Sequence, residues 1–213
     1  MTMDAFDFGD GAGLVLAHQH ENGGGWVAAS AEVSPRAVVA PDARVFHAAR
    51  VLGANRILDH ATVSGEALID EMAVLFDGAR VEGRAHVYGS AQIFGQACIS
   101  ERASVGGNAR IFDQAFIGGA AEVQDNAWVF EQAQVAGSAK IHGTARLGGD
   151  CRIAGEAHVS GYVRVFGQAR IQGHAYVSGS CEVSGVTVVD GQAEVIGFAV
   201  VTEGVYDGHA HLE

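Results

Sequence analysis

The sequence predicts an all-β protein, a parallel β-helix in which short strands wind around one axis and stack coil upon coil. Two observations predict it. From Val33 to Val201 every sixth residue is Val, Ile or Leu, 29 in succession. Two positions before each aliphatic residue stands a small residue, almost always Ala, and two positions after it stands Gly or an acid in nearly every hexad. The spacings of three and four that an amphipathic helix requires are missing.

Each hexad has a physical interpretation as one strand and one bend. In each hexad the small residue and the aliphatic residue are two positions apart. Side chains two positions apart in a strand point to the same face, so both point toward the core. The Gly or acid that follows begins a two-residue bend, where Gly turns without a Cβ clash. Pro35 and Pro41 fall at the bends of the first two hexads, where a missing N–H is tolerated. Repeating this unit predicts parallel strands stacked on themselves.

This Ala-x-Val-x-Gly-x repeat resembles the hexapeptide-repeat proteins, and among them most closely the YdcK-like group. The resemblance covers residues 31–204. It implies a single-stranded left-handed parallel β-helix, a triangular prism with three hexads, about 18 residues, per coil. The 29 hexads would then make nearly ten coils, a prism about 45 Å tall at the usual spacing of strands.

The two ends lie outside the repeat. Residues 1–30 are expected to form a small N-terminal cap, because the first coil of a solenoid has an unpaired edge that must be covered. Residues 205–213 are expected to be a C-terminal tail, and Leu212 and Glu213 have the sequence of a vector-derived extension. This gives three segments: cap, β-helix and tail.

Composition argues against several classes of partner. Lys and Arg number 13 and Asp and Glu 25, for a formal net charge of −12. No basic cluster stands out, so nucleic acid and anionic membranes are not expected partners. No apolar run is long enough for a membrane span, and the N-terminus is acidic where a signal peptide is basic. Three widely spaced Cys make no disulfide framework. We therefore expect a cytoplasmic protein.

One outer face differs from the others when residues 18 apart are aligned. It carries a column of Phe that is interrupted at Gly148, and beside it a column with Trp128 between two Arg. Stacked rings can simply stabilise neighbouring coils, but such a strip is also typical of an interface. The predicted interface residues are Leu58, Phe76, Phe94, Phe112, Trp128, Phe130, Phe166, Arg110 and Arg146.

Other candidate sites are sparse. His142 and His158 are diagonal neighbours on another face and are the candidates for a general base. His18, His20 and Glu21 are candidates for a metal site, although three ligands so close on a loop are usually incidental. We predict neither a catalytic group nor a bound metal or cofactor.

Two functions follow, from different classes. The first is a non-catalytic structural scaffold or binding module, which self-associates as a trimer or an end-stacked polymer, or docks a protein partner, through the Phe face. The alternative, implied by the resemblance, is a hexapeptide-type acyltransferase that uses acyl-CoA or a sugar nucleotide and acts as a trimer with sites between subunits. The repeat shows no inserted loop, which favours the scaffold. An acidic mimic of nucleic acid is a weaker third idea, because the acids are scattered among Arg.

Overall fold

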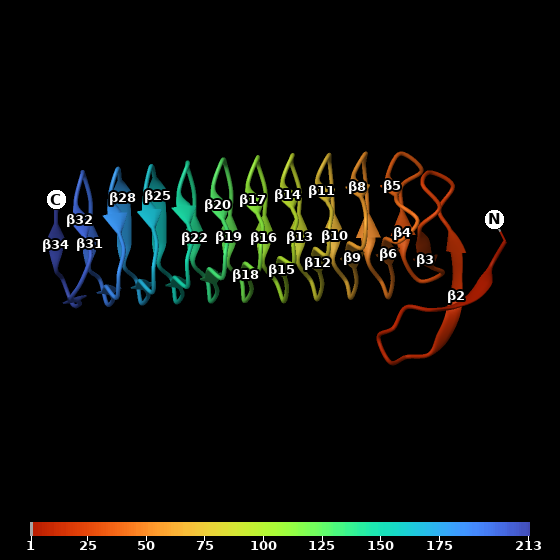
Figure 1. Cartoon of the computed structure of the whole chain (residues 1–213), viewed down its shortest axis with the longest axis horizontal. Helices are drawn as coiled ribbons and strands as arrows, with labels where there is room; N and C mark the ends of the chain where they lie inside the picture. The colour runs from red at the N-terminus through yellow and green to blue at the C-terminus, as the bar shows by residue number, and fades with distance from the viewer. Residues whose placement is uncertain (1) are drawn as a thin grey trace.

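A computed structural model describes residues 2–213 of the chain. It contains 34 strands, which wind into a stack of coils with the N-terminus at one end and the C-terminus at the other (Figure 1). The residues described include no helix that is long and apolar enough to cross a membrane. The strands form three sheets, one on each side of the prism.

The first sheet contains thirteen strands. In order of pairing they are β1 (Asp4–Asp7), β2 (Leu14–Gln19), β3 (Trp26–Ala28), β6 (Arg44–Val45), β9 (Thr62–Val63), β12 (Arg80–Val81), β15 (Cys98–Ile99), β18 (Phe116–Ile117), β21 (Gln134–Val135), β24 (Arg152–Ile153), β27 (Arg170–Ile171), β30 (Val188–Val189) and β33 (Val205–Tyr206).

The second sheet contains eleven strands. They are β4 (Glu32–Val33), β7 (Arg50–Val51), β10 (Leu68–Ile69), β13 (His86–Val87), β16 (Ser104–Val105), β19 (Glu122–Val123), β22 (Lys140–Ile141), β25 (His158–Gly161), β28 (Tyr176–Gly179), β31 (Glu194–Val195) and β34 (His211–Leu212).

The third sheet contains ten strands. They are β5 (Val38–Val39), β8 (Arg56–Ile57), β11 (Val74–Leu75), β14 (Gln92–Ile93), β17 (Arg110–Ile111), β20 (Trp128–Val129), β23 (Arg146–Leu147), β26 (Arg164–Val165), β29 (Glu182–Val183) and β32 (Val200–Val201).

The pairing confirms the predicted fold class. Within the coils neighbouring strands are parallel, and Arg110, for example, pairs with Trp128, 18 residues later in the chain. The predicted inward residues form one continuous core: Ala127 and Val129 are both completely buried, as are nearly all members of the two inward columns. Small and aliphatic residues alternate along each strand, so the narrow interior is filled almost entirely by apolar side chains.

Four polar or thiol side chains replace inward Ala, and three of them, Asn55, Cys181 and Thr187, bond to backbone. The Oδ1 atom of Asn55 accepts the N–H of Ala73 at 2.8 Å, and its amide also donates to the Ile69 carbonyl. The Thr187 hydroxyl donates to the Ser184 carbonyl at 2.8 Å, and the Cys181 thiol donates to the Ser178 carbonyl. These contacts explain how the core tolerates departures from Ala.

The bends use the left-handed backbone conformation that the Gly positions predict. Gly65 and Gly95, with φ of 71° and 67°, stand two residues after the aliphatic position. Eight residues other than Gly share positive φ, and each occupies this same position: His47, Asp59, Glu71, Asp77, Glu101, Asp113, Asp125 and Glu131. Positive φ is uncommon for such residues, so their side chains must compensate for the strain.

The N-terminal segment extends the first sheet. Strands β1 and β2 form an antiparallel hairpin, β2 pairs antiparallel with β3, and β3 pairs parallel with β6. The core therefore already includes Val27, before residue 31 where the repeat was expected to begin. The loop after β2 lies on the first strand of the third sheet, because Gly25 donates to the Val39 carbonyl at 2.9 Å and Val39 donates to Asn22 at 3.0 Å. A Cβ at Gly23 would lie 2.3 Å from the Val39 carbonyl oxygen, so this close approach requires Gly.

A small aromatic cluster fastens the hairpin to the outside of the prism. Phe6 stacks on Trp26 at 4.2 Å between ring centroids, and Phe8 stacks on Phe46 at 5.0 Å. Arg44 donates to the Phe8 carbonyl at 2.9 Å. This cluster was not predicted, because its residues fall outside the register of the Phe column.

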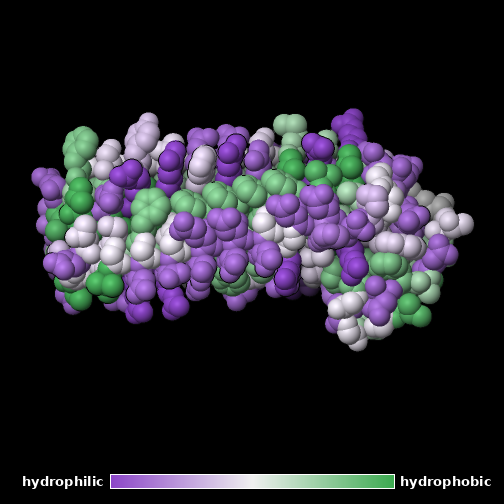
Figure 2. Space-filling view, in the orientation of Figure 1, coloured by the Kyte–Doolittle hydropathy of each residue, from purple (hydrophilic) through white to green (hydrophobic). Residues whose placement is uncertain are grey.

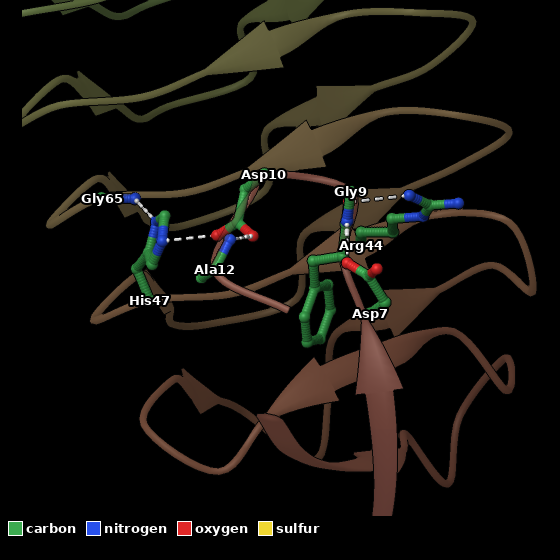
Figure 3. Close-up of polar contacts among 8 residues, drawn as sticks. Asp7, Gly9, Asp10, Ala12, Arg44, His47 and Gly65 are labelled. Carbon is green, nitrogen blue, oxygen red and sulfur yellow. Dashed lines mark hydrogen bonds and ion pairs between the residues drawn. The ribbon is translucent and has the colours of Figure 1, made fainter. Parts of the chain in front are cut away.

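A polar contact holds the tip of the segment that follows β1 (Figure 3). Asp10 lies 2.8 Å from His47 Nε2, and the Nδ1 atom of the same ring accepts the N–H of Gly65 at 3.3 Å. Backbone hydrogen bonding from Ala12, and the nearby imidazole, lower the pKa of Asp10. The imidazole thus joins the N-terminal segment to the second coil.

The C-terminal residues also differ from the expectation. Residues 205–213 were expected to be a tail, but β33 pairs with β30 and β34 pairs with β31, both in parallel. Leu212 is half-buried against the core, and His211 Nδ1 lies 3.1 Å from a Glu194 carboxylate oxygen. Two sheets therefore continue past residue 204, because strand pairing tolerates the loss of the strict six-residue register.

Candidate functional site

The Phe column is a stack of parallel rings on the outside of the third sheet. Centroid distances are 4.7 Å from Phe76 to Phe94, 4.8 Å from Phe94 to Phe112 and 5.1 Å from Phe112 to Phe130, with the rings within 6° of parallel. Each ring covers the next, so the side chains are half-buried instead of freely exposed. Leu58 and Phe166, at the two ends of the predicted strip, are also half-buried.

The interruption at Gly148 is closed by the flanking rings. Phe130 and Phe166 meet there edge to face, at 6.1 Å and 66°. A Cβ at Gly148 would lie 2.8 Å from the Phe130 ring and 3.1 Å from Phe166. The column is therefore continuous in space although one Phe is missing from the sequence.

Trp128 lies between two guanidinium groups, as the 18-residue spacing of Arg110, Trp128 and Arg146 predicts. The Cζ atom of Arg110 lies 5.2 Å from the Trp128 ring centroid and that of Arg146 lies 4.7 Å from it. Both distances fall in the range of cation–π attraction. The indole also meets Phe112 edge to face at 6.2 Å. The structure thus joins the two columns into one surface, which we call the aromatic face: Leu58, Phe76, Phe94, Arg110, Phe112, Trp128, Phe130, Arg146 and Phe166.

The two candidate catalytic histidines are in contact on the second sheet. The rings of His142 and His158 lie 5.6 Å apart and nearly perpendicular, and His158 also meets Tyr176 at 5.2 Å. Burial lowers the pKa of His158, and the charges of His142 and Lys140 lower it further. A neutral imidazole at physiological pH is the form that a general base requires.

The three metal candidates do not converge. His20 is buried and its Nδ1 atom lies 3.2 Å from the carbonyl oxygen of Asn22, whereas His18 is half-buried and Glu21 is exposed. Burial, the largest cause, and the neighbouring His20 lower the pKa of His18. No group of three His, Cys, Asp or Glu able to hold a metal ion occurs within residues 2–213.

The cysteines are poor nucleophiles in this fold. Burial raises the pKa of Cys151 to about 12 and also raises the pKa of Cys98 and Cys181. Because the thiolate is the reactive form, a raised pKa disfavours these thiols as nucleophiles at neutral pH.

Sequence reasoning missed the most exposed aromatic residues. Phe198 and Tyr162 are 84% and 72% exposed, at the same corner of the prism, two coils apart. Apolar side chains also reach the surface near the C-terminal end of the prism, at Val186, Val200 and Val205 (Figure 2). The signal was available, since each is an apolar residue at an outward position where other coils carry polar ones.

No protein-family model matches the chain, and no curated protein matches it. Among solved structures it is similar to a UDP-N-acetylglucosamine acyltransferase from Arabidopsis, with 17% sequence identity and a TM-score of 0.31, over 79% of this chain and 72% of that chain. The fold assignment rests on the strand pairing described above. The chain is a parallel β-solenoid with a six-residue sequence repeat.

Proposed function

We propose that this β-solenoid is a non-catalytic scaffold or binding module, which self-associates or docks a protein partner through the aromatic face. The observation that carries the proposal is the continuity of that face. Its rings stack over successive coils from Phe76 to Phe130, and Phe130 meets Phe166 edge to face across the coil that carries Gly148. Beside them Trp128 and two Arg supply residue types that are enriched at binding hot spots.

The regularity of the coils supports a scaffold. Between Val33 and Val201 each strand follows the last after one short bend, and no extended loop interrupts them. Binding and catalytic residues are usually carried on loops that a rigid framework positions. Without such loops, the flat outer faces are the surfaces that remain for recognition.

The finer features of the proposal follow from composition and from the resemblance of the repeat. We infer a homo-oligomer, trimeric or end-stacked, in the cytoplasm, related to the YdcK-like group. The net charge of −12 disfavours nucleic acid and anionic membranes as partners.

Light-scattering chromatography tests the proposal. Phe94→Glu with Phe112→Glu places two charges on the aromatic face, and we expect a lower oligomer mass with an unchanged β-sheet spectrum. Gln124→Glu with Ser138→Glu adds the same charge away from that face and should leave the mass as in the wild type. If neither pair of substitutions changes the oligomer mass, the rings only stabilise neighbouring coils and do not form the interface.

The contact between His142 and His158 favours a second candidate function, a hexapeptide-type acyltransferase that uses acyl-CoA. The same chromatography, combined with thermal unfolding with and without acetyl-CoA, separates the two functions. A trimer that acetyl-CoA stabilises against thermal unfolding, with the effect lost in His158→Gln, would support the transferase. A melting temperature that does not change with the cofactor would support the scaffold.

A further inference from the structure

A polar groove lies around the corner from the aromatic face, where the third sheet turns into the first. Its volume is about 350 Å³, within the range of small-molecule sites. Three successive coils line it, each with one residue at the corner and one on a strand of the first sheet. The lining residues are Gln132, Gln134, Asp150, Arg152, Gln168 and Arg170.

Two arginine side chains on neighbouring strands line this groove. Arg152 and Arg170 are register partners on β24 and β27, and both are exposed. Within residues 2–213 neither has an ion pair, whereas Arg164 on the neighbouring sheet is paired with Glu182 at 2.5 Å. Like charges directly opposite each other on adjacent strands are unfavourable. An anion between the two guanidinium groups would relieve the repulsion and accept their N–H donors in pairs.

The other lining side chains are also free to bind. The amides of Gln132, Gln134 and Gln168 make no side-chain hydrogen bond to the part of the chain that the structure describes, nor does the carboxylate of Asp150. By contrast, Gln172 on the same sheet donates to Asp190 at 2.7 Å. The groove thus collects amide donors and one carboxylate acceptor around the two cations.

The middle coil of the groove is also where the repeat departs from its pattern. The corner residue is Gln at 96, 114, 132 and 168, but Asp at 150, and the adjacent inward Ala is replaced by Cys151. The Asp150 carboxylate accepts hydrogen bonds but cannot donate them, and it lies between the amides of Gln132 and Gln168. Packing of the core does not require it, because Asp150 is exposed. Ionised carboxylates accept hydrogen bonds from hydroxyl groups.

We propose that this groove binds a polyhydroxylated acid, a small molecule that carries a carboxylate or phosphate together with hydroxyl groups. Arg152 and Arg170 hold the oxyanion, and Asp150 accepts from a hydroxyl while the Gln amides hydrogen-bond the others. The site is separate from the aromatic face, so it does not depend on the proposed function. Its open walls imply weak, small-molecule affinity.

Isothermal titration of the whole chain tests the site with four probes. D-glucuronate and D-glucose 6-phosphate carry both chemical features, D-glucose lacks the oxyanion, and acetate lacks the hydroxyls. We expect saturable binding of one or both of the first two, at least about tenfold tighter than glucose or acetate. Equal affinity for all four probes, or binding of none, would overturn the proposal.

Matched variants locate the binding. Arg152→Gln with Arg170→Gln should weaken the affinity for the bound probe at least about tenfold. Arg56→Gln with Arg80→Gln removes the same charge elsewhere on the prism and should leave the affinity unchanged. Equal weakening in both double variants would show a general effect of charge and contradict the site. Asp150→Asn should reduce the ratio of the affinity for glucuronate to the affinity for acetate. An unchanged ratio would overturn the role of Asp150.

Discussion

The carboxylate of Asp113 accepts a hydrogen bond of 3.1 Å from the backbone N–H of Glu131, the residue above it on the next coil. Asp77 does the same for Gly95 at 3.1 Å, and Asp125 for Gly143 at 2.8 Å. Within residues 2–213 these N–H groups have no backbone partner at the bend. The hydrogen bond explains why acids share the left-handed position with Gly: the carboxylate satisfies a donor that would otherwise depend on water.

Asp113→Ala should therefore destabilise the protein more than Asp113→Gly. Both variants lose the hydrogen bond, but Ala also keeps the strain of a φ near 57°, which Gly does not feel. We expect a loss of about 1 to 3 kcal/mol for Ala and a smaller one for Gly. Urea unfolding measures both, and equal losses would show that backbone strain at the bend is negligible.

Ala127→Leu should overpack the interior. Ala127 is completely buried at an inward position, so the larger side chain forces neighbouring strands apart at a cost of about 1 to 3 kcal/mol. Ala136→Leu makes the same change on the outside of the prism, where Ala136 is half-buried, and should cost less. Thermal unfolding compares them, and similar melting temperatures would contradict the tight packing of the Ala column.

Asn55→Ala should be destabilising although it restores the residue that the repeat favours. The change leaves the buried N–H of Ala73 without the Asn55 oxygen that now accepts it, whereas the Ile69 carbonyl keeps its hydrogen bond from the Leu52 N–H at 2.8 Å. An unsatisfied buried group costs about 1 to 3 kcal/mol. Urea unfolding checks this, and a neutral or stabilising result would mean that the bend relaxes to supply its own backbone bond.

Stability should fall as the pH decreases below about 6.5, the ordinary pKa of His. Burial, together with His142 and Lys140, lowers the pKa of folded His158, so the unfolded chain binds a proton at a higher pH than the folded chain does. Between the pKa of His158 in the unfolded chain and its lower pKa in the folded chain, proton binding favours unfolding. The contribution of His158 to the free energy of unfolding is fully present above this pH range and is lost as the pH falls through it. An NMR titration should place the His158 midpoint below the ordinary value, and a midpoint above it would contradict the buried environment.

Much of the fold could be predicted from the repeat. The strict aliphatic period and the Ala column determine which side chains face inward, because a one-residue shift would expose all of them. The acids and Gly two residues later determine the bends. The candidate sites were less predictable: Trp128 was correctly placed beside two Arg, yet the half-burial of the Phe rings depends on how each covers the next.

The sequence by itself determined the parallel β-helix, its inward columns and the contents of each outer column, since all three follow from local periodicity. Tertiary structure decided the rest, because it depends on contacts between residues without a fixed spacing. It placed the N-terminal hairpin on the outside of the prism through Phe6, Trp26 and Arg44. It also added the C-terminal strands to the sheets, where the strict six-residue register is lost.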